Sequence, residues 1–151
     1  MKTFMKFATA CLVLILTTAA FGQEFEKAQF FAKAAPGQKK SDPVKGVFRF
    51  DSAAQELQFR NERGEMIFAV KKASIKNLTY ERAAKPRYAA GLLVAWPLLF
   101  TKSKSHFLTV QYDDEHGAQY AIVKLDKSNF RDALASIEAQ TGKKIERHEE
   151  S

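Results

Sequence analysis

Apolar and polar residues alternate with a period of two in several short segments of this chain, and this alternation limits the folds open to it. A period of two places every second side chain on the same face, as in a β-strand that buries one face and exposes the other. In the segment 46–51, Phe48 and Phe50 share one face and Arg49 and Asp51 the other. We predict strands at 46–51, 56–60, 66–70, 75–81, 107–112 and 118–126.

Polar turns containing glycine separate these segments. The turns at 61–64 and 113–117 both contain a glycine, the residue that tolerates a positive φ most readily. The second turn lies between two well-alternating segments, so we predict that it joins them into a β-hairpin.

A single later segment, near the end of the chain, has apolar residues at helical spacing and predicts one amphipathic helix. Asp126 or Ser128 would cap the start of this helix, and Gly142 would end it in the left-handed conformation. We expect Ile145 to fold back onto the apolar stripe. The predicted fold class is therefore mainly β with one C-terminal α-helix. The stripe consists of Phe130, Leu134, Ile137 and Thr141.

The first 22 residues have the pattern of an export signal. Two lysines precede an uncharged, leucine-rich run at 10–20, which is too short to span a bilayer as a helix. We expect cleavage between Gly22 and Gln23, and an exported mature protein that is periplasmic or secreted. The only cysteine, Cys11, would leave with the leader, so the mature chain would have neither a disulfide nor a thiol nucleophile.

The remaining chain has the length and composition of one globular domain, with 46% hydrophobic and 27% charged residues overall. The residues 36–43 are rich in Pro, Gly and Lys, and we expect 23–45 to be a flexible lead-in. The folded domain would span 46–146, followed by a loose tail at 147–151. The formal charge of +7 includes two lysines of the leader, so the domain is only mildly basic and we expect no nucleic-acid partner.

The order of six or seven short strands followed by one helix resembles small, exported, uncharacterised bacterial proteins with a pleckstrin-homology-like domain. The resemblance covers roughly 45–146 and implies a bent antiparallel barrel that the helix caps at one end. The residues that carry it are Gly46-x-Phe48-x-Phe50-Asp51, Leu57-x-Phe59, Ile75-x-x-Leu78, His106-Phe107-Leu108-Thr109-Val110-x-Tyr112 and Thr141-Gly142-Lys143-Lys144.

The resemblance does not extend to a phosphoinositide site. Members that bind these lipids carry a basic-x-Arg pair in the second strand, because a doubly phosphorylated headgroup needs several fixed cations. This chain has Gln58-Phe59-Arg60 at that place, and the preceding turn at 52–55 has no charged residue. We therefore do not assign that ligand.

No catalytic or metal-binding pattern is present in the sequence. His106, His116 and His148 fall in three separate predicted elements, without the spacing of a zinc site. We find no nucleophile elbow, phosphate loop or dinucleotide fingerprint. We therefore predict no cofactor, no metal and no enzymatic activity, while a hydrolase with a dispersed site remains an alternative.

The most distinctive segment is an uncharged run, Ala89–Phe100, with basic residues on both sides. On an exposed hairpin tip, its apolar side chains and Trp96 would enter a membrane interface while the bases contact anionic headgroups. In the interpretation that we favour, the run is a buried strand and the charges mark its solvated ends. The candidate surface residues are Arg82, Lys85, Arg87, Trp96, Lys102, Lys104 and His106.

Two functional hypotheses follow. The first is an exported, non-enzymatic binding or scaffold domain that recognises a protein or peptide, through a strand edge or a groove beside the helix. The second is peripheral association with an anionic membrane surface through the segment 82–106.

Overall fold

The computed structural model describes residues 23–32, 42–84, 86 and 103–149. The predicted export signal at 1–22 and the apolar run at 89–100 lie outside the described residues. The described part is mainly β with one helix, as the sequence predicts.

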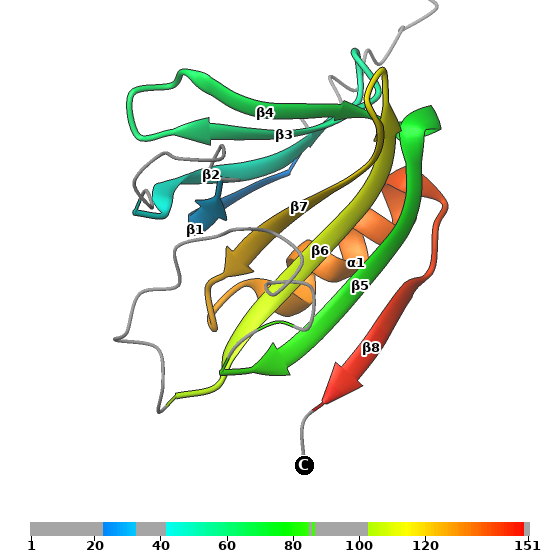
Figure 1. Cartoon of the computed structure of the whole chain (residues 1–151). Helices are drawn as coiled ribbons and strands as arrows, with labels where there is room; N and C mark the ends of the chain where they lie inside the picture. The colour runs from blue at the N-terminus through cyan, green and yellow to red at the C-terminus, as the bar shows by residue number, and fades with distance from the viewer. Residues whose placement is uncertain (1–22, 33–41, 85, 87–102, 150–151) are drawn as a thin grey trace, which may run out of the picture.

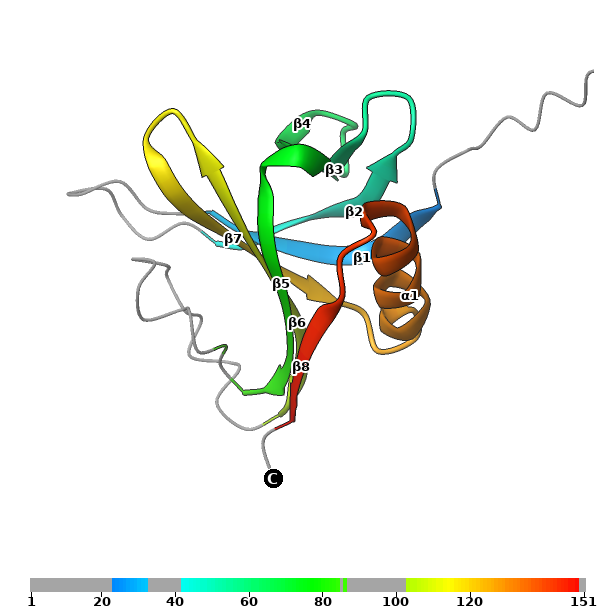
Figure 2. The ribbon, with the colours of Figure 1, turned by 90° about the vertical axis from the view of Figure 1, so that its right-hand side faces the viewer.

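Eight strands form one sheet in the order β4-β3-β2-β1-β7-β6-β5-β8. All neighbours are antiparallel except β5 and β8, which run parallel. Figures 1 and 2 show that the sheet bends strongly, so that β1 and β2 cross the direction of β5 and β6, with α1 against its inner side. The elements are β1 (Glu24–Phe31), β2 (Val44–Asp51), β3 (Glu56–Asn61), β4 (Met66–Lys71), η1 (Lys72–Ser74), β5 (Ile75–Ala83), β6 (Ser105–Asp114), β7 (Gly117–Leu125), α1 (Phe130–Thr141) and β8 (Ile145–Glu149).

The six predicted strands correspond to β2 to β7, and the predicted hairpin is formed by β6 and β7. The expectation of six or seven strands was too low, because β1 and β8 add to the pairing. Within the described residues, β4 and β8 are the two edges, so the sheet is open where we expected a barrel.

The predicted flexible lead-in at 23–45 is wrong for 24–31. This segment is β1, which lies in the middle of the sheet between β2 and β7. A β-bulge between Phe25 and Ala28 breaks the alternation, so that Phe25, Ala28 and Phe30 are all buried although their spacing is irregular. The Pro and Gly residues of 36–43 favour flexibility in that segment, but the prediction wrongly extended this flexibility to the residues before it.

The predicted loose tail is also wrong, because 147–149 belong to β8. Ile145 is 2% exposed and pairs with Leu78 of β5, and the ladder continues to Arg82 and Glu149. Figure 2 shows β8 alongside β5. Among the described residues, β8 is an edge strand that pairs with β5 alone. Most of its residues after Ile145 are exposed, and its sequence therefore lacks the alternation of apolar and polar residues that identifies a strand.

The core lies between the concave side of the sheet and α1. The helix contributes Ala133, Leu134 and Ile137, all nearly inaccessible, and Ile145 packs beside them as predicted. Gly142 ends α1 with φ 67°, also as predicted. The predicted side-chain cap is not formed: Asn129 occupies the cap position, and the Asp126 carboxylate accepts a hydrogen bond from the Ser128 backbone N–H instead.

Gly46 is required by the close approach of β2 to β3. A Cβ atom at this position would lie 1.9 Å from the backbone oxygen of Arg60. We expect Gly46→Ala to lower the free energy of unfolding by at least about 3 kcal/mol, because backbone cannot move aside as a side chain can. Gly64→Ala is the matched control, since Gly64 has φ 81° and open space around it, and the strain of the left-handed conformation costs about 1–2 kcal/mol. Urea denaturation measures the free energy of unfolding of both variants. Equal losses for the two would contradict the close approach of β2 to β3 at Gly46.

The central position of β1 predicts a large effect at Phe30. Its ring is 8% exposed and lies 5.5 Å from the Phe59 ring and 5.3 Å from the Phe68 ring, centroid to centroid. We expect Phe30→Ala to cost about 3–5 kcal/mol of unfolding free energy. Met66→Ala, at a position 42% exposed, is expected to cost less than about 1 kcal/mol. A negligible loss of unfolding free energy for Phe30→Ala would contradict the central position of β1 and favour the flexible lead-in instead.

Candidate functional site

A hollow lined mainly by basic residues lies where β1, β7, the start of β6 and the end of β5 come together. Its volume is about 530 Å³. The basic side chains come from five places: β1, β5, the residue before β6, β7 and the connection from β7 to α1. We call this hollow the basic groove, and its charged lining residues are Lys27, Arg82, Lys104, Lys124, Asp126 and Lys127.

The strand register divides several of the lining residues into two sets. Arg82 of β5 is directly opposite His106 of β6, and His106 is opposite Leu125 of β7. On the other side of β7, Lys124 is opposite Gln29 of β1. Directly opposed residues in an antiparallel pair lie about 5 Å apart on one face of the sheet, so Arg82, His106 and Leu125 share a face. Gln29 and Lys124 are one position out of phase and share the opposite face, and residues of both sets line the groove.

Three of the predicted site residues line the basic groove: Arg82, Lys104 and His106. The other four, Lys85, Arg87, Trp96 and Lys102, lie outside the described residues. The remaining basic residues of the groove are not among the residues predicted from the sequence. Lys27 falls in the segment expected to be flexible, and the lysines of β7 and its following turn look like ordinary solvated charges. The missed residues are Lys27, Lys124 and Lys127.

Lys27 has an unusual backbone conformation. It lies in the β1 bulge with φ 57°, a left-handed value that costs a residue with a side chain about 1 kcal/mol or more. Bulges of this kind often redirect a side chain at a functional site. The described structure places Lys27 on the lining of the groove together with Gln29, whose buried Oε1 has no hydrogen-bond partner in the structure.

Asp126 is the only carboxylate on the described lining of the basic groove, and it already has a partner. Its Oδ1 accepts hydrogen bonds from the hydroxyl and the backbone N–H of Ser128. These bonds lower the pKa of Asp126, and the charges of Lys27 and Lys127 add to the effect. Lys124 is half-buried, and desolvation lowers its pKa, an effect that Asp126 opposes.

His106 forms part of an aromatic stack at one side of the groove. Its ring lies 3.7 Å from the Phe130 ring, centroid to centroid, with an interplanar angle of 9°. The Tyr80 hydroxyl is 2.7 Å from His106 Nδ1. Burial lowers the pKa of His106, and the positive charges of Arg82 and Arg131 lower it further.

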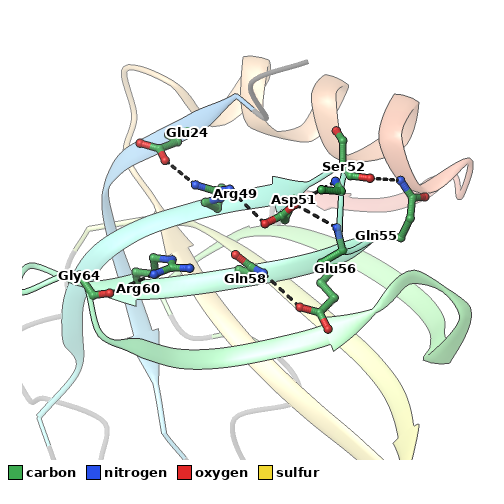
Figure 3. A network of polar contacts seen from close by, with 11 residues as sticks. Glu24, Arg49, Asp51, Ser52, Gln55, Glu56, Gln58, Arg60 and Gly64 are labelled. Atoms are coloured by element: carbon green, nitrogen blue, oxygen red, sulfur yellow. Dashed lines mark hydrogen bonds and ion pairs between the residues drawn. The ribbon is translucent and has the colours of Figure 1, made fainter. Parts of the chain in front are cut away.

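Basic residues elsewhere on the sheet are engaged in a different way. Figure 3 shows Arg49 between two carboxylates, with Nη1 2.8 Å from Glu24 and Nη2 3.2 Å from Asp51. Arg60 donates a hydrogen bond from Nη1 to the backbone oxygen of Gly64. These contacts are structural, whereas the basic groove gathers five cations around one carboxylate.

The arrangement of the groove favours electrostatic recognition of an anion. Its concave shape and closely spaced cations focus a positive potential.

The described residues contain no group of three or more His, Cys, Asp or Glu side chains placed to hold a metal ion. In the same part of the chain, no helix combines the length and apolar character needed to span a bilayer.

Comparison with known proteins supports the fold. Neither a protein-family model nor a curated protein matches this chain. Among solved structures, the chain is similar to one in the structure of the Spt16D Pob3N heterodimer, with 14% sequence identity and a TM-score of 0.51. The similarity covers 87% of this chain but only 57% of that one. At this identity the likeness concerns the fold alone, and it supports the pleckstrin-homology-like arrangement that the sequence resembles.

Proposed function

We propose that this protein is an exported, non-enzymatic binding domain that recognises an acidic peptide segment of a protein partner in the basic groove. The observation that carries the proposal is the convergence of five basic side chains, from separate segments, on one hollow of about 530 Å³. The only carboxylate on its described lining already accepts two hydrogen bonds from Ser128. The five cations exceed the one carboxylate on this lining, and the resulting positive potential favours an anionic occupant.

The groove has the dimensions and chemistry for a short acidic segment. Its volume falls within the range of about 300–1,000 Å³ that is usual for ligand pockets. Arg82 can bind a carboxylate through two parallel N–H bonds, while the lysines act as flexible point charges. In this proposal the bent sheet forms the wall of a partly closed barrel that α1 caps, and the groove opens at one end of it.

An anionic membrane is the competing partner. Arg82, Lys104 and His106 flank the segment between β5 and β6, so the same charges would face headgroups if that segment entered a bilayer. We favour a peptide because the cations line a recessed hollow. Binding to a bilayer surface is better served by cations that project from a flat or convex face.

Charge reversal in the groove is expected to weaken binding of an acidic peptide. The probe is an oligo-aspartate peptide labelled with tetramethylrhodamine, and fluorescence anisotropy measures its dissociation constant. We expect Arg82→Glu and Lys127→Glu each to weaken binding about tenfold, because each change replaces an attraction by a repulsion. Arg63→Glu is the control, since Arg63 is an exposed cation in the turn between β3 and β4, outside the groove. Higher salt should weaken binding to the wild-type protein.

Flotation with vesicles of anionic lipid distinguishes an acidic peptide from an anionic membrane as the partner of the groove. Binding to the peptide that is lost in both groove variants and kept in the control would support the proposal. Binding to vesicles without binding to the peptide would replace it by the membrane alternative. Absence of both would refute an anion-binding role for the groove.

A further inference from the structure

His106 belongs both to the basic groove and to the aromatic stack beside it. One side of its ring lies on Phe130 of α1, at 3.7 Å between centroids, and its Nδ1 contacts the Tyr80 hydroxyl of β5. The residue also lines the groove together with the five cations. An ion in the groove would therefore lie close to an imidazole whose position is fixed by packing and by a hydrogen bond.

The charged groups around His106 come from each neighbouring element. Arg82 of β5 and Arg131 of α1 oppose a positive charge on the ring, whereas Asp126 and Glu149 of β8 favour one. Burial has the largest effect, and together these influences hold the pKa of His106 below its usual range. Without an anion nearby, these influences favour the neutral imidazole.

We infer that an anion bound in the basic groove draws a proton onto His106, so that the protein binds its acidic partner more tightly as the pH falls. The inference rests on the proposed function and concerns the regulation of the same site. A bound carboxylate would offset the repulsion from Arg82 and Arg131, and so it would favour the imidazolium. By linkage, protonation of His106 must then favour the bound carboxylate to the same extent.

The local hydrogen bonds accommodate both charge states. In the neutral ring with its proton on Nε2, Nδ1 accepts a hydrogen bond from the Tyr80 hydroxyl. After a proton from solvent binds to Nδ1, the ring donates and the Tyr80 oxygen accepts, because a hydroxyl can serve either role. The 2.7 Å contact can thus persist through the titration. The face of Phe130 adds a favourable interaction with the cationic ring.

The test measures binding of the oligo-aspartate probe between about pH 5.5 and pH 8, a range in which the aspartates stay ionised. We expect the wild-type protein to bind about threefold more tightly at the acidic end, because binding of the anion and protonation of His106 favour each other. His106→Gln should remove this dependence, so that its affinity for the probe is the same at both ends of the pH range. His116→Gln, in the exposed turn between β6 and β7, is the matched control and should behave as the wild type.

A direct measurement does not depend on the folding of any variant. NMR titration of the His106 ring in the wild-type protein gives its pKa with and without the probe, and we expect a higher value in the complex. Peptide binding with an unchanged His106 pKa, or with a pH dependence that His106→Gln retains, would overturn the inference and leave the proposed function standing. Absence of peptide binding at every pH would overturn both.

Discussion

The short ladder between β1 and β7 joins the two halves of this protein. One half contains β1 to β4 and the other contains β5 to β8 with the helix, and the described sheet connects them only through the pairs Gln29↔Lys124, Phe30↔Val123 and Phe31↔Ile122. These pairs place Phe30 against the rings of β3 and β4 and set Gln29 and Lys124 on the lining of the groove. The main core and the candidate site therefore depend on the same few residues.

The irregularity of β1 links stability to the proposed function. A regular strand would keep alternate residues on opposite faces, whereas the bulge lets Phe25, Ala28 and Phe30 all contribute to the core. The extra residue leaves Lys27 in a left-handed conformation beside the groove. The burial of these apolar side chains offsets the backbone strain at Lys27, so the strain can persist where this charged side chain lines the groove.

Elements governed by local patterns could be predicted from the sequence, and elements governed by distant partners could not. Alternation identified β2 to β7, and helical spacing with Gly142 identified α1. The bulge concealed β1, and pairing on a single side concealed β8. At the site, the bases flanking the apolar run led to Arg82, Lys104 and His106. Lys27, Lys124 and Lys127 join them through the bulge in β1, the pairing of β7 and the connection after β7, which composition and spacing along the chain do not reveal.

The last strand protects an otherwise exposed edge. β8 covers the outer side of β5, where Leu78 and Tyr80 are almost fully buried, and it presents Glu146, Arg147 and Glu149 to solvent. Charged residues on an edge strand discourage pairing with strands of other molecules. A chain without β8 would present the bare side of β5 to its neighbours. The charged strand β8 thus protects the sheet against edge-to-edge aggregation.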